Sequence, residues 1–169
     1  MLIGIISDSH DNIENISKVL EWFNKQGIKT LLHCGDLCAP SILVNVLAEK
    51  FPGTINVVFG NVDGDRFLMQ KLISEKALHN VLLHGELAEI EIDGKKIAMN
   101  HYPAIAKNLA ASGNYDLVCY GHNHIQAEEK VGNTLMLNPG TLGGIFAPAT
   151  LATYDTATGE AKLLSLEEL

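Results

Sequence analysis

Side chains of the types that bind transition metals recur at five places in this sequence, each directly after a segment that is predicted to be a strand. The five groups are Asp8-Ser9-His10, Gly35-Asp36, Gly60-Asn61-Val62-Asp63, Asn100-His101 and Gly121-His122-Asn123-His124. In parallel α/β sheets the carboxyl ends of the strands meet at one edge, and ligands bind there. We therefore expect the five groups to converge on a single site.

Such a convergence of carboxylate, imidazole and amide groups suits a pair of divalent transition-metal ions. A carboxylate can bridge two ions, and mixed oxygen and nitrogen ligands favour manganese, iron, zinc, cobalt or nickel over calcium, which prefers oxygen alone. Two ions about 3.5–4 Å apart clamp a phosphoryl group and lower the pKa of a bound water. The glycines before Asp36, Asn61 and His122 are expected to let the backbone turn tightly at these strand ends.

The first half of the chain alternates strand and helix. Strands are predicted at 2–7, 28–33 and 55–59, and helices at 13–26 and 41–50, the first of them from apolar residues that repeat along one face. Asp11 and Glu14 have the spacing of a capping box before the first helix, and Gly27 is placed to end it. This order predicts a parallel sheet with right-handed crossovers.

The second half changes character at a hairpin, because residues 87–92 alternate, Asp93-Gly94 is typical of a tight turn, and residues 95–99 return. A helix at 104–111 and strands at 116–120, 125–130, 134–137, 150–154 and 161–164 complete the prediction. Phe67, Leu68 and Met69 are assigned to the core. The whole predicts one mixed α/β domain over residues 1–169, with two packed sheets flanked by helices.

The composition narrows the class of protein. The chain is 47% hydrophobic and 19% charged, as in soluble globular domains, and has neither a membrane span nor the features of a signal peptide. Three cysteines without a CxxC pair argue against disulfides and thiolate zinc sites. We expect a cytoplasmic protein. The net charge of −8 disfavours a long nucleic acid as partner, whereas bound cations would still attract a phosphate ester.

Six short blocks occur in a fixed order: SDSHDN (7–12), HCGD (33–36), GNVD (60–63), NH (100–101), GHNH (121–124) and NPGT (138–141). In order and spacing they resemble the calcineurin-like metallophosphoesterase superfamily, and the layout is most similar to its small phosphodiesterases of the YfcE type. The resemblance implies a four-layer α-β-β-α sandwich with mixed sheets. It also implies in-line attack on phosphorus by a metal-bound hydroxide.

The same resemblance implies a ligand set for two ions. The first would be held by Asp8, His10, Asp36 and His124, and the second by Asp36, Asn61, His101 and His122, with Asp36 shared. Asn61 would also contact the substrate. Manganese is the expected metal, with nickel, zinc, iron or cobalt left open.

Two residues depart from the family pattern. Val62 stands where many members carry a His that is thought to protonate the leaving group, and a valine cannot donate a proton. Diesters and good leaving groups would then be favoured, with Asp63 as the remaining candidate for a catalytic side chain. Tyr102 follows His101 where Gly is usual, so its ring is expected to narrow the mouth of the site or to stack on a substrate.

Simpler explanations stay open for each group. Asp8 and Asp36 could cap helices, Asn61 could serve only as a turn residue, and the GHNH histidines could be surface residues. His84 is a rival of His101 for the hairpin position. Two other histidines are assigned no ligand role: His33 is expected to pack beside the site and His79 to be solvated.

The predicted function is a two-metal phosphodiesterase acting on a small phosphodiester, in a protein whose helix faces would also allow a homo-oligomer. The alternative is a metal-binding scaffold for protein interactions, like the retromer subunit Vps29, which resembles this family but has a degraded metal site. All seven expected ligands are present here, which favours the enzyme. A monoesterase or a nuclease is disfavoured by Val62 and by the acidic net charge.

Overall fold

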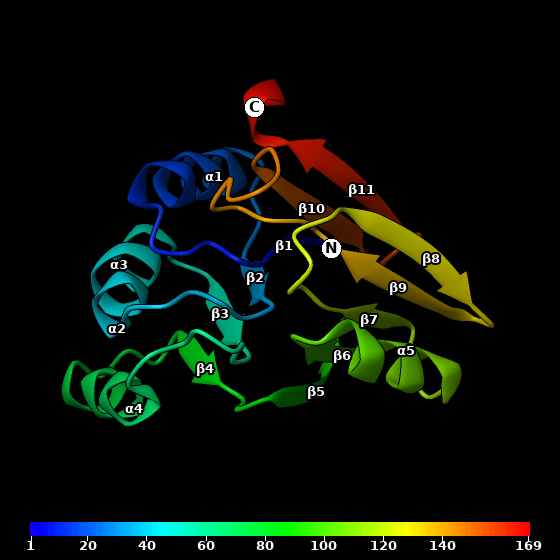
Figure 1. The fold of residues 1–169 in the computed structure, drawn as a ribbon, viewed down its shortest axis with the longest axis horizontal. Helices are drawn as coiled ribbons and strands as arrows, with labels where there is room; N and C mark the ends of the chain where they lie inside the picture. Colours follow the sequence, from blue (N-terminus) through cyan, green and yellow to red (C-terminus); the bar gives the residue numbers. More distant parts are fainter.

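A six-stranded sheet forms one half of the molecule in the computed structural model, which describes residues 1–169 (Figure 1). Its strand order is β11-β10-β1-β2-β3-β4. The parallel strands are β1 (Leu2–Ile6), β2 (Thr30–His33), β3 (Thr54–Val57) and β4 (Val81–Leu83). At one side β10 (Thr150–Asp155) joins β1 antiparallel, and β11 (Glu160–Ser165) forms a hairpin with β10.

A five-stranded sheet of order β5-β6-β7-β9-β8 forms the other half. The predicted hairpin is present as β5 (Leu87–Ile92) and β6 (Lys95–Asn100). Parallel pairing then links β6 to β7 (Leu117–Cys119) and β7 to β9 (Thr134–Asn138), and β8 (Ala127–Val131) closes the sheet antiparallel to β9. Both sheets are mixed, as expected.

Helices cover the outer face of each sheet. The first sheet carries α1 (Ile13–Lys25) and α4 (Arg66–Glu75). Between them in the chain is a second helical segment, which consists of α2 (Pro40–Ile42), a wider π turn (Leu43–Leu47) and α3 (Ala48–Lys50). The second sheet carries α5 (Pro103–Ala111), and a short 3-10 turn (Leu166–Glu168) ends the chain. None of these helices is both long and apolar enough to span a bilayer.

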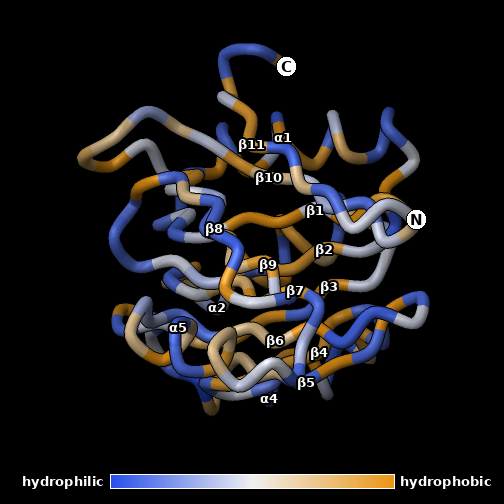
Figure 2. The backbone as a smooth tube through the Cα atoms, turned by 90° about the vertical axis from the view of Figure 1, so that its right-hand side faces the viewer, coloured by the Kyte–Doolittle hydropathy of each residue, from blue (hydrophilic) through white to orange (hydrophobic).

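Three apolar clusters hold the four layers together. The largest lies between the first sheet and its helices, and a smaller one, with Ala106 and Ala110, lies under α5. Between the sheets, Ile3, Ile5 and Leu32 of one sheet pack with residues such as Met99 and Leu117 of the other. Figure 2 shows these apolar strands in the middle of the molecule. The predicted α-β-β-α sandwich is confirmed.

Several local expectations were wrong. Helix α4 and strand β4 were not predicted, because each buries little: Met69 is the one buried residue of α4 and Val81 the one buried residue of β4. Phe67 is 80% exposed rather than part of the core. The cap of α1 is Asn12, whose side chain accepts from the amide of Asn15, while Asp11 accepts from the amide of Ala39. Gly27 does end the helix, with a φ of +72°.

Two neighbouring residues of α4 therefore make a matched pair. Met69→Ala empties a buried position and is expected to lower the free energy of unfolding by about 2–5 kcal/mol, whereas Phe67→Ala changes an exposed one and should stay within about 0.5 kcal/mol. Urea unfolding followed by circular dichroism measures both values. Equal effects of the two substitutions would contradict this packing of α4.

Candidate metal centre

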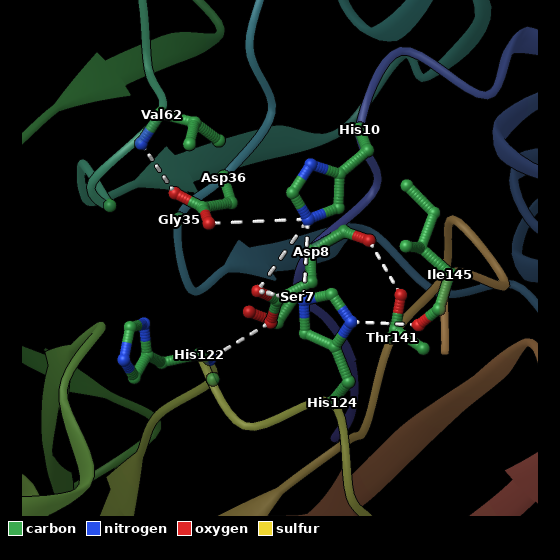
Figure 3. A network of polar contacts seen from close by, with 12 residues as sticks. Ser7, Asp8, His10, Gly35, Asp36, Val62, His122, His124, Thr141 and Ile145 are labelled. Atoms are coloured by element: carbon green, nitrogen blue, oxygen red, sulfur yellow. Dashed lines mark hydrogen bonds and ion pairs between the residues drawn. The ribbon is translucent and has the colours of Figure 1, made fainter. Parts of the chain in front are cut away.

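The five polar groups converge at the ends of their strands, as Figure 3 shows for most of them. Asp8 and His10 follow β1, Asp36 follows β2, and Asn61 follows β3. From the second sheet, His101 follows β6, and His122 and His124 follow β7. The cluster therefore lies where the two sheets meet, with ligand atoms from both. His84 lies elsewhere, its Nε2 2.9 Å from Oδ1 of Asn56, so His101 is the histidine that joins the cluster.

One half of the cluster is formed by Asp8, His10 and His124, whose ligand atoms lie within 4.8 Å of one another. Nε2 of His124 is 3.2 Å from Oδ1 of Asp8 and 3.3 Å from Nε2 of His10. The other ring nitrogen of His124, Nδ1, is 2.8 Å from the carbonyl of Ile145. A carbonyl only accepts, so Nδ1 carries the proton and Nε2 presents a lone pair to the cluster.

Nε2 of His10 and Nε2 of His124 thus both face the Asp8 carboxylate. Oδ1 of Asp8 is fully buried and has no hydrogen-bond partner, and burial raises the pKa of this carboxyl group above its usual value. Buried polar groups without partners are costly, and native proteins satisfy nearly all of them. A divalent cation between the carboxylate and the two imidazoles would satisfy all three atoms, so the residues present fit a metal ion.

The other half of the cluster is built around Asp36 and His101. Oδ2 of Asp36 is 3.4 Å from Nε2 of His101 and 4.0 Å from Nε2 of His10, so this carboxylate lies between the two halves. Asn61 completes this half, with its Oδ1 3.1 Å from Nε2 of His101 and 2.9 Å from Nδ1 of His122. Nδ1 of His101 contacts the carbonyl of Cys34 at 2.8 Å, which again directs Nε2 inward.

The electrostatics of this half indicate a place for positive charge. Burial acts to raise the pKa of Asp36, but hydrogen bonds from His101 and the amide of Val62 outweigh it, so this pKa is lowered. Burial acts to lower the pKa of His101, but its bond with Asp36 reverses the direction, and the pKa is raised. The Asp36 carboxylate therefore stabilises positive charge beside it.

Comparison with known proteins agrees with this geometry. Residues 1–159 match the family model of the calcineurin-like phosphoesterase superfamily domain. The chain belongs to the calcineurin-like phosphoesterase superfamily. As a member it is a metal-dependent phosphoesterase that binds divalent ions.

The relatives extend this assignment. Phosphodiesterase MJ0936 of Methanocaldococcus jannaschii is 34% identical over 99% of this chain and 100% of its own length. Phosphodiesterase YfcE of Escherichia coli is 24% identical over 84% of this chain and 79% of its own, which agrees with the expected branch. A solved archaeal phosphodiesterase superposes with a TM-score of 0.88 at 31% identity, covering 98% of this chain and 99% of its own.

Vps29 is also a structural neighbour of this chain. Zinc-bound Vps29 of Entamoeba histolytica has a TM-score of 0.68 over 98% of this chain and 99% of its own, at 18% identity. Identity this low indicates a shared fold and no more.

Strained backbone surrounds the superfamily's metal-binding blocks in this chain. Five of the seven clustered residues have a left-handed φ, which is uncommon outside glycine: Asp8, His10, Asp36, His122 and His124. The loops are held by bonds between them, including Asp8 N–H to the Gly35 carbonyl and the Thr141 hydroxyl to the Asp8 carbonyl, both at 2.9 Å. Such strain collects at functional sites when the surroundings enforce it.

The Asp63 carboxylate links two of these loops through hydrogen bonds. Asp63 is 8% exposed, and its carboxylate accepts from three backbone amides, those of Asp36 (3.0 Å), Cys38 (2.9 Å) and Gly60 (2.7 Å). Through these bonds Asp63 holds the backbone of Asp36 in place. The Gly-Asp turns are the only sign of these bonds in the sequence. The three amides belong to two loops that are separated along the chain.

Asn12 and Ala39 precede the helices that Asp8 and Asp36 could have capped, so neither aspartate is a cap.

His33 is buried, with Nε2 3.0 Å from the Ser9 hydroxyl, and burial lowers its pKa to about 4. His79 is exposed, as expected. The Tyr102 ring lies beside the cluster, its centroid 5.2 Å from that of His101 and 5.3 Å from that of His122.

Two of the three glycines are required for space rather than for turning. Gly35 has a φ of +96°, as a tight turn needs. A Cβ on Gly60 would lie 2.1 Å from Oδ1 of Asp36, and one on Gly121 would lie 2.0 Å from Oγ of Ser7. These close approaches let the Asp36 carboxylate and the GHNH loop lie against their neighbours.

Gly60→Ala should therefore displace Asp36 and weaken metal binding at least tenfold, in the range of about 10–100-fold that supporting residues of metal sites show. Gly64→Ala is the matched control, because a Cβ there meets nothing nearer than the Cys38 carbonyl at 3.8 Å. Isothermal titration of metal-stripped protein with Mn²⁺ measures the affinities. Unchanged affinity in a folded Gly60→Ala variant would show that Asp36 is not held as described.

Proposed function

We propose that this metal-dependent phosphodiesterase uses two divalent ions to hydrolyse a small phosphodiester. The first ion would be held by Asp8, His10, Asp36 and His124, and the second by Asp36, Asn61, His101 and His122. The observation that carries the proposal is the buried Asp8 oxygen without a partner, facing two imidazole nitrogens. Both ligand sets include Asp36, which lies between the two halves of the cluster.

When bound, two such ions supply Lewis-acid stabilisation of phosphoryl oxygens and lower the pKa of a coordinated water. The protein's own part is to fix the ligands before substrate arrives. Asp63 fixes the backbone of Asp36, and the amide of Val62 donates to Oδ1 of Asp36 at 3.0 Å. Asn61 and His122 are exposed, so we assign them to the mouth of the site, with Asn61 in contact with the substrate.

Charge and proton supply favour a diester over a monoester. A phosphodiester carries one negative charge, whereas a phosphomonoester carries up to two at neutral pH. Arg66 is the one arginine of the chain, and its guanidinium is engaged by Glu86 at 3.0 Å and by the Gly60 carbonyl at 2.8 Å. Val62 is 45% exposed at the mouth and offers a leaving group no proton.

The scaffold function, which the sequence left open as the alternative, is the second candidate. The clustering of all seven expected ligands and the 34% identical relative named a phosphodiesterase support the enzyme more strongly. Manganese as the metal, a cytoplasmic location and assembly into a homo-oligomer stay predictions.

Metal-stripped protein should cleave bis(p-nitrophenyl) phosphate only after Mn²⁺, Ni²⁺, Zn²⁺ or Mg²⁺ is restored, and should prefer this diester to p-nitrophenyl phosphate. Asp36→Asn and His122→Ala are expected to lower kcat/KM at least 100-fold, because each removes a ligand of the proposed ions. His84→Ala is the control histidine outside the cluster. Metal binding without turnover of either ester would move the scaffold function to the front.

Val62→His tests the missing proton donor. General acid catalysis contributes about 10²–10⁴-fold, so this variant should gain at least tenfold on diesters with poor leaving groups and little on p-nitrophenyl esters. A series of aryl diesters measures the slope of log kcat/KM against leaving-group pKa, which should become shallower. If the wild-type protein and Val62→His gave the same slope, position 62 would not lie beside the leaving group.

A further inference from the structure

Phe146 is the most exposed large apolar side chain of the protein, and it lies directly beside the metal cluster. Its side chain is 97% exposed. Its ring stacks on that of His124, with centroids 5.9 Å apart and planes inclined by 28°. Since His124 belongs to the cluster, the phenyl ring lies next to the site, and its face turned away from His124 is open to solvent.

The exposure of this ring is imposed by a tethered loop. Phe146 has a φ of +65°, which is a genuine outlier for a bulky residue. The preceding residue is fixed to the cluster, because the Ile145 carbonyl accepts from Nδ1 of His124 at 2.8 Å. A short parallel bridge between Thr141 and Ala149 closes the base of the loop. Strain held in place next to a reactive centre points to a role there.

A hollow with both apolar and polar residues adjoins this loop. Its volume is about 470 Å³, and it is lined by His124, Ile125, Ala147 and Pro148 together with four polar residues, Gln126, Thr150, Ser165 and Glu167. The Ile125 side chain, next to His124, is 63% exposed and offers apolar surface. Small-molecule sites occupy about 300–1,000 Å³, so the hollow has the size to hold part of a substrate.

We propose that the open face of Phe146 stacks against a planar aromatic group, such as a nucleobase, on the alcohol of the diester that stays attached to phosphorus. This inference rests on the proposed phosphodiesterase function. It assigns the substrate class to diesters of nucleosides or similar aromatic alcohols.

The position of the ring selects the retained alcohol rather than the leaving one. In Figure 3 Val62 and Ile145 lie on opposite sides of Asp8 and Asp36. In the proposed reaction Val62 borders the leaving group, so the Phe146 loop borders the other alcohol. Stacking also suits a chain of net charge −8, since it needs no cationic side chain and accepts any base.

Two diesters with the same leaving group and the same charge test the proposal on the metal-loaded enzyme. They are the p-nitrophenyl ester of thymidine monophosphate and ethyl p-nitrophenyl phosphate. Phe146→Ala should lower the ratio of kcat/KM for the thymidine ester to that for the ethyl ester about tenfold, mainly through KM. Phe146→Trp should restore the ratio. Phe67→Ala is the matched control, an exposed phenylalanine on α4, and should leave the ratio unchanged.

The outcomes separate the two proposals. If the wild-type enzyme cleaves both esters and Phe146→Ala changes them equally, or changes neither, the stacking role is wrong while the phosphodiesterase proposal stands. If the wild-type enzyme cleaves neither ester with any of the four metals, the phosphodiesterase proposal fails and the stacking role fails with it. A ratio that falls in Phe146→Ala and recovers in Phe146→Trp supports both.

Discussion

The structure depends most on how the buried negative charge of Asp8 is compensated. Its Oδ1 has no hydrogen-bond partner and faces Nε2 of His124 at 3.2 Å, although both atoms are acceptors. Leaving such groups buried and unpaired is costly. Asp8 and Asp36 come from one sheet and His101, His122 and His124 from the other. In the arrangement that we propose, metal ions would therefore also link the two sheets.

The loops that carry these ligands are held by hydrogen bonds within the protein. Asp63 gathers three amides from two loops, and the Thr141 hydroxyl bonds to the carbonyl of Asp8. Close contacts at Gly60 and Gly121 leave no room for side chains. Preorganised ligands reduce the cost of ordering on binding, both for metals and for the charge that develops in a phosphoryl transition state.

Around this rigid centre the surface is open and has little positive charge. The mouth is formed by Asn61, Val62 and His122, with Tyr102 on one side and the Phe146 loop beside His124. Metal ions would supply the attraction for phosphate that Lys and Arg supply in many other proteins. Apolar and aromatic groups then remain to distinguish one substrate alcohol from another, which is the basis of the stacking role proposed for Phe146.

The sequence by itself determined the order of most elements, the two-sheet architecture and the seven clustered residues. Hydrophobic periodicity marks elements that are buried on one side, and strand ends in parallel sheets meet at one edge. It did not reveal α4, in which Met69 is the one buried side chain, or the true cap at Asn12. Only the tertiary structure decided the unpartnered Asp8 oxygen, the bracing by Asp63 and the exposure of Phe146, because these depend on contacts between loops far apart in the chain.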